Sequence, residues 1–131
     1  MTESSPLSLS KLIVSVVDDD PAMREALVDL LDSAGFSALA FDSGKAFMLS
    51  GAAERSHVVI TDIQMPGCSG LDILQTLSTT LHPSPPVIVI TALTDQALEQ
   101  QAIKQGCYVF LSKPFDPVTL LSHLNDVAER L

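Results

Sequence analysis

Three short apolar runs, far apart in the chain, each end in charged side chains. They are residues 12–17 followed by Asp18, Asp19 and Asp20, residues 57–61 followed by Asp62, and residues 108–112 followed by Lys113 and Pro114. If these runs are buried parallel strands, their carboxyl ends lie along one edge of a sheet, where open α/β proteins place their ligand sites. The sequence therefore predicts one acidic pocket that contains a single lysine.

Strand and helix patterns alternate five times along the chain. Short Val- and Ile-rich runs are typical of strands covered on both faces, and apolar residues at three-to-four spacing predict helices. The expected strands are 12–17, 36–41, 58–61, 87–91 and 109–111, and the expected helices are 21–34, 44–50, 71–80, 95–105 and 117–131. Parallel strands need crossovers packed on both faces of the sheet, so five such units predict one doubly wound α/β domain.

Local signals mark the ends of two of these helices. The Asp-Pro pairs at 20–21 and 116–117 each offer a capping carboxylate and a proline suited to the first helical turn. Gly35 and Gly106 are the expected stops, because glycine accepts the left-handed conformation that often closes a helix.

Composition supports one compact domain. Of the 131 residues, 47% are hydrophobic and only 18% are charged, whereas disorder would need the opposite balance. The Ser-rich residues 1–10 are expected to form a flexible tail, with the domain spanning 11–131. This tail does not resemble a secretory signal, and no apolar run approaches the roughly 20 residues of a membrane span. We expect a cytoplasmic protein without membrane contact.

The charge balance and the cysteines limit the partners. Sixteen acidic and seven basic residues give a net charge of -9, which opposes direct contact with nucleic acid phosphates. A role at DNA would therefore need another domain or another protein. Cys68 and Cys107 are expected to be free thiols, with Cys107 buried at the start of a strand.

The acidic pocket suggests phosphoryl chemistry. Clustered carboxylates repel one another unless a cation or proton relieves them, and oxygen ligands favour Mg²⁺ or Ca²⁺. Magnesium takes few carboxylates and leaves positions open to phosphate oxygens. A carboxylate can attack a phosphoryl donor and form an acyl phosphate, and Asp62, alone at the end of its strand, is the candidate nucleophile. Asp20, directly before a proline, is assigned to helix capping instead.

Four motifs in order resemble the receiver domain of bacterial two-component response regulators. They are V-V-D-D-D-P at 16–21, T-D-I-Q-M-P-G-C-S-G at 61–70, I-T-A at 90–92 and S-K-P-F at 112–115. Each motif alone is weak, but their combination and spacing are specific. The resemblance implies a flavodoxin-like (βα)5 fold with strand order 2-1-3-4-5. It also implies a phosphoacceptor signalling domain rather than an enzyme.

The resemblance assigns metal and phosphate roles to individual residues. It makes Asp62 the acceptor of a phosphoryl group from a sensor histidine kinase. Asp19, Asp62 and the backbone carbonyl of Gln64 would bind Mg²⁺, with Asp18 acting through a metal-bound water. Lys113 would pair with the phosphoryl oxygens.

Similarity also assigns the residues that carry the signal away. Thr91 would turn its hydroxyl toward the phosphate, and the N–H of Ala92 would donate to it. Phe110 would follow Thr91 inward and change the face formed by the fourth helix, fifth strand and fifth helix. Pro114 would follow a cis peptide bond.

The motifs look closest to receivers of transcriptional regulators with a helix-turn-helix domain, which predicts transcriptional output and a phosphorylation-dependent homodimer. One alternative is an interaction module of the same fold that works without phosphate. A phosphatase or mutase would need an acid two residues after Asp62, where Gln64 stands. A flavin protein would need a phosphate-binding loop after the first strand, where Asp18, Asp19 and Asp20 would repel the phosphate.

Overall fold

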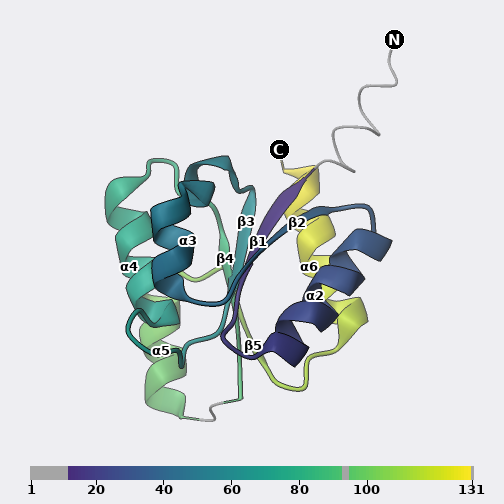
Figure 1. Ribbon diagram of the computed structural model, residues 1–131. Coiled ribbons are helices and arrows are strands. Elements are labelled where there is room, and N and C mark those ends of the chain that lie inside the picture. The colour runs from purple at the N-terminus through teal and green to yellow at the C-terminus, as the bar shows by residue number, and fades with distance from the viewer. Residues whose placement is uncertain (1–11, 93–94, 131) are drawn as a thin grey trace.

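The computed structural model describes residues 12–92 and 95–130, so the expected tail at 1–10 lies outside the described residues. Five parallel strands form one sheet in the order β2-β1-β3-β4-β5, which confirms the predicted fold class (Figure 1). The strands are β1 (Ile13–Val17), β2 (Ser37–Phe41), β3 (Val58–Thr61), β4 (Val87–Thr91) and β5 (Val109–Ser112). The helices are α2 (Pro21–Ser33), α3 (Gly44–Ser50), the short 3₁₀ helix η1 (Ala52–Arg55), α4 (Gly70–Thr80), α5 (Gln96–Lys104) and α6 (Pro117–Glu129).

Helices cover both faces of the sheet (Figure 1). Leu27 of α2 and Leu124 of α6 pack on one face in a core that includes Ile60, whereas α3, α4 and α5 cover the other face, where Val59 is buried. Neighbouring residues of one strand thus enter opposite cores, as the two-residue period of a strand requires. All four residues of β3 are buried, which explains its continuous apolar sequence.

The helix ends follow the predicted signals with one exception. Asp20 caps α2 by accepting from the N–H of Ala22, and Gly35 and Gly106 have positive φ angles of 93° and 94° just past their helices. Asp116 stands at the N-cap of α6, but its side chain makes no capping hydrogen bond. Instead, its carboxylate accepts from the hydroxyl of Thr119 at 2.7 Å, so the prediction of a capping carboxylate was wrong there.

Some other features of the fold were not predicted, or differ from what the sequence predicts. Neither η1 nor the cis peptide bond at His82–Pro83 was predicted from the sequence. Both cysteines are free, as expected, but Cys107 lies before β5 and is only half-buried rather than buried. Within the two described ranges, no helix is both long enough and apolar enough to cross a membrane.

Candidate functional site

The parallel register brings the acidic ends of β1 and β3 together. Val17 pairs with Thr61, and the N–H of Asp62 donates to the carbonyl of Val17 at 3.2 Å. Asp18 and Asp62 are therefore neighbours across the sheet edge, both buried, while Asp19 beside them is exposed. Each of these three residues offers a carboxylate oxygen within 4.8 Å of the others.

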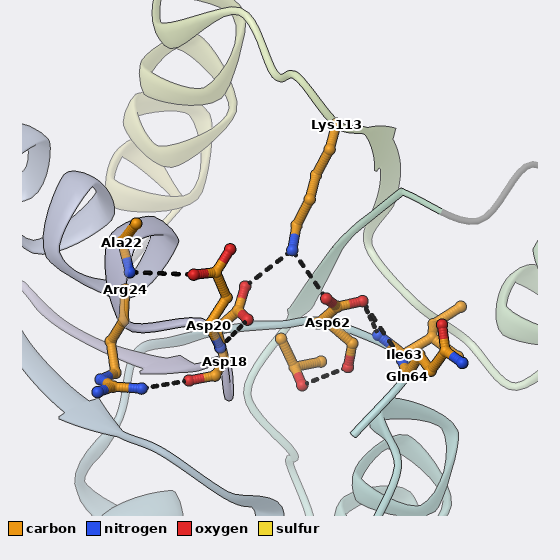
Figure 2. A network of polar contacts seen from close by, with 9 residues as sticks. Asp18, Asp20, Ala22, Arg24, Asp62, Ile63, Gln64 and Lys113 are labelled. Carbon is orange, nitrogen blue, oxygen red and sulfur yellow. Dashed lines mark hydrogen bonds and ion pairs between the residues drawn. The ribbon is translucent and has the colours of Figure 1, made fainter. Parts of the chain in front are cut away.

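Lys113 joins the two buried carboxylates from the end of β5 (Figure 2). Its Nζ lies 2.8 Å from Oδ2 of Asp62 and 3.1 Å from Oδ2 of Asp18. Its backbone N–H donates to the carbonyl of Thr91 at 2.9 Å, which ties the lysine to the end of β4. The peptide bond to Pro114 is cis. One cation is thus shared between two acids that come from different strands.

Burial and charge act in opposite directions on this cluster. Burial raises the pKa of Asp18, and hydrogen bonds from the Asp20 N–H and Lys113 offset only part of that effect. Burial alone would lower the pKa of Lys113, but its hydrogen bonds to Asp62 and Asp18 and the charges of these acids outweigh burial and raise the pKa. Lys113 is therefore firmly cationic, while burial continues to disfavour the ionised form of Asp18.

Backbone N–H groups hold the remaining carboxylate oxygens. Oδ1 of Asp62 accepts from the N–H of Ile63 at 2.6 Å and of Gln64 at 3.3 Å, as Figure 2 shows. Oδ1 of Asp18 accepts from the N–H of Asp20 at 3.0 Å. Each buried acid thus has one oxygen held by the backbone and the other held by Lys113.

The other predicted site residues surround this cluster at different depths. Thr91 is buried at the end of β4, and Ala92 follows it on the surface. Gln64 is exposed and, with Asp19, lines a cavity of about 520 Å³. Phe110 lies on β5, half-buried against the core beneath α3, α4 and α5.

Sequence reasoning gave no individual role to three residues that touch the site backbone. Nη1 of Arg24 donates to the carbonyl of Asp18 at 2.7 Å. Thr61 and Gly70 both lie against the carbonyl of Asp62. The last two stand at the first and last positions of the T-D-I-Q-M-P-G-C-S-G motif, which is the signal that could have drawn attention to them.

The arrangement of acids and lysine on this fold defines a class of protein. The family model of the response regulator receiver domain matches residues 14–125. The chain therefore belongs to the response regulator receiver family.

Curated relatives connect this receiver to transcriptional regulators. The chain is 38% identical over 103 residues to the transcriptional regulatory protein FixJ of Bradyrhizobium diazoefficiens, covering 79% of this chain and 50% of the relative. It is also 38% identical over 104 residues to the DNA-binding transcriptional regulator NtrC of Salmonella typhimurium, covering 79% of this chain and 22% of the relative. The chain thus spans half or less of the length of these relatives.

Solved structures agree with the fold. The crystal structure titled FixJ-N has a TM-score of 0.80 and 31% identity, with 92% of this chain and 96% of that chain covered. A response regulator receiver protein from Pseudomonas putida has a TM-score of 0.81 and 32% identity, with 88% and 97% covered.

Proposed function

We propose that Asp62 accepts a phosphoryl group from a sensor histidine kinase and that the resulting acyl phosphate is the signal this domain carries. One observation carries the proposal: two buried carboxylates, directly after β1 and β3, share a single lysine that directly follows β5. Such a cluster has an excess of negative charge and a cation placed to pair with an incoming phosphoryl group.

The proposed reaction transfers the phosphoryl group from a histidine nitrogen to a carboxylate oxygen of Asp62. A carboxylate oxygen of Asp62 attacks the phosphorus of the phosphohistidine, the P–N bond breaks, and its electron pair returns to the imidazole nitrogen. Lys113, now 2.8 Å from Oδ2 of Asp62, would pair with oxygens of the transferred group. The N–H groups of Ile63 and Gln64 hold Oδ1 and so fix the orientation of the carboxylate.

The donor set fits a magnesium ion. Three carboxylates within 4.8 Å of one another are hard oxygen ligands, which Mg²⁺ prefers. Asp18, Asp19, Asp62 and the carbonyl of Gln64 are the residues proposed to hold it. When bound, Mg²⁺ would neutralise charge shared by the carboxylates and the phosphoryl oxygens.

We further propose that the signal leaves through α5, β5 and α6. Thr91 and Lys113 are joined by a backbone hydrogen bond, and Phe110 lies on the same strand that ends at the site. A phosphoryl group that binds the hydroxyl of Thr91 and the N–H of Ala92 would bias this face toward a second conformation. Transcriptional output and a phosphorylation-dependent homodimer are the proposed consequences in the cytoplasm, with DNA contacted by another domain or protein.

The decisive experiment is intact mass after incubation with a small phosphoryl donor. Acetyl phosphate supplies a P–O donor and phosphoramidate a P–N donor like phosphohistidine. Wild type is expected to gain one phosphoryl group only with Mg²⁺, and Asp62→Asn none. Asp20→Asn is the matched control, because it makes the same change at an exposed carboxylate that caps α2.

Two results would contradict the proposal. Phosphoryl transfer to Asp62→Asn would place the acceptor elsewhere. No adduct on folded wild type with either donor would instead favour the phosphate-independent interaction module.

A further inference from the structure

Two residues at opposite ends of one motif meet at a single backbone atom, the carbonyl oxygen of Asp62. The hydroxyl of Thr61, in a residue only 1% exposed, donates to this oxygen at 2.8 Å. Gly70, the first residue of α4, also lies against this oxygen. A methyl group at position 70 would overlap the carbonyl oxygen and lie 2.9 Å from the carbonyl carbon, so no larger residue fits without moving the Asp62 backbone.

This carbonyl shares a peptide plane with a group that holds the proposed phosphoacceptor. The C=O of Asp62 and the N–H of Ile63 belong to one planar peptide, so fixing the direction of one fixes the other. That N–H donates to Oδ1 of Asp62 at 2.6 Å. Gly70 also donates its own N–H to the carbonyl of Ile63 at 3.0 Å, which ties the next peptide to the start of α4.

We infer that Thr61 and Gly70 are positioning residues that clamp the Asp62–Ile63 peptide and thereby set the orientation of the Asp62 carboxylate. With Oδ1 held by the Ile63 N–H, Oδ2 is left facing Lys113 at 2.8 Å. The effect on phosphorylation rests on the proposed function of Asp62. The clamp itself is a property of the unphosphorylated protein and is tested separately.

The first test removes one hydroxyl. Thr61→Val keeps the shape of the side chain but loses the hydrogen bond, and Thr61→Ser restores it. The readout is the amide of Ile63 in NMR spectra without phosphoryl donor. In Thr61→Val we expect its proton to move upfield and to exchange faster, because its hydrogen bond to Oδ1 weakens. Ser15→Ala is the control, because it removes another buried hydroxyl hydrogen bond that does not involve Asp62.

The same variants are then phosphorylated with acetyl phosphate. Displacements near 1 Å at a reacting group can cost about a hundredfold in rate, so a partly released carboxylate in Thr61→Val is expected to react roughly tenfold more slowly. Thr61→Ser and Ser15→Ala are expected to react like wild type. If Thr61 had only a structural role, Thr61→Val would be less stable than wild type. Its phosphorylation rate, however, would not fall in Thr61→Val and recover in Thr61→Ser.

The second test adds one methyl group at either of two helix starts. Gly44, the first residue of α3, is also closely packed, but a methyl group there would meet Cys68 rather than Asp62. Gly70→Ala is expected to shift the Ile63 amide and slow phosphorylation, and Gly44→Ala to do neither. If both variants act alike, the effect belongs to the whole loop and the clamp is wrong.

The outcomes separate the clamp from the proposed function. An unchanged Ile63 amide in Thr61→Val overturns the clamp whether or not the protein is phosphorylated. A shifted amide in a protein whose wild type takes no phosphoryl group supports the clamp and contradicts the proposed function. Should Gly70→Ala fail to fold, the comparison of Thr61→Val with Thr61→Ser still decides.

Discussion

The two ends of the paired strands β1 and β3 bury polar groups in different ways. Toward the amino end, the hydroxyls of Ser15 in β1 and of Ser56 before β3 lie 2.6 Å apart, and the Ser56 hydroxyl donates to the carbonyl of Ala52 at 2.7 Å. The N–H of Ile13 donates to Nδ1 of His57 at 2.9 Å. Each of these groups has a hydrogen-bond partner within the protein, and none of these partners is a carboxylate or a lysine.

At the carboxyl end, the same two strands are followed by more negative charge than positive charge. Asp18 and Asp62 are buried and share Lys113, and Asp19 adds a third carboxylate at the surface. The polar groups at the amino end are paired with one another or with the backbone, whereas the carboxyl end has more negative charge than one lysine neutralises. Under the proposed function, the amino end serves the fold, whereas the carboxylates at the carboxyl end lower stability and are kept to bind a cation and a phosphoryl group.

The largest effect is expected from removing the shared cation. Lys113→Met leaves two buried carboxylates facing each other, and loss of one partner of a buried pair typically costs about 3–5 kcal/mol. We expect a loss of stability in this range in urea unfolding without divalent cations, together with loss of phosphorylation. Lys104→Met, at an exposed lysine of α5, should change stability by less than about 0.5 kcal/mol. Equal losses of stability in Lys113→Met and Lys104→Met would show that the folded protein does not depend on Lys113 to relieve the repulsion between the two buried carboxylates.

Removing a negative charge from the carboxyl end should instead increase the stability of the protein. Because folding raises the pKa of Asp18, this carboxyl favours the folded state at acidic pH, and that contribution is lost as the pH rises through the folded-state pKa. Asp18→Asn has no such titration. It is expected to unfold at higher urea than wild type at pH 7, with a gain that shrinks as the solution is acidified.

Magnesium provides the control for this prediction. A ligand that binds only the folded state stabilises it by mass action, so added Mg²⁺ should stabilise wild type more than Asp18→Asn. An Asp18→Asn variant that is less stable than wild type at pH 7 without Mg²⁺ would contradict the view that the clustered carboxylates lower the stability of the folded protein.

A smaller effect is expected at the amino end. Ser15→Ala removes one buried hydroxyl hydrogen bond, a change that typically costs about 1 kcal/mol. Urea unfolding should show this loss, while the rate of phosphorylation by acetyl phosphate should match wild type. A slower reaction would mean that the two ends of the strands are coupled through β1, and the division of roles between them would fail.

The sequence predicted the carboxyl end better than the amino end. The acids and the lysine stand directly after apolar runs, so the topology alone was enough to bring Asp18, Asp62 and Lys113 together. The hydrogen bond between Ser15 and Ser56 carries no such signal, because it depends on how η1 packs beside β1. Similarly, the sequence contains Gly70, but only the folded structure shows that it lies against the carbonyl of Asp62.

Helix capping shows the same limit at a single residue. Asp20 and Asp116 are each followed directly by a proline, yet of these two only Asp20 accepts a capping N–H hydrogen bond. Asp116 has a competing donor in Thr119, one turn along α6. The Asp-Pro pair gives the position of the helix start, but the neighbouring side chains decide which of the competing hydrogen bonds forms.

The smallest predicted effect concerns a thiol beside the carboxyl end rather than the buried acids themselves. Cys68 lies in the loop after Asp62, and burial, followed by the charge of Asp72, raises the pKa of its thiol. Since the thiolate is the reactive form, iodoacetamide should modify Cys68 more slowly than free cysteine. Asp72→Asn should speed this reaction only modestly, because burial is the larger cause, and should leave Cys107 unchanged. Cys107, whose thiol pKa is raised by burial and then by Glu99, should respond to Glu99→Gln instead. If Asp72→Asn leaves the Cys68 rate unchanged, the charge of Asp72 does not contribute to the low reactivity of this thiol.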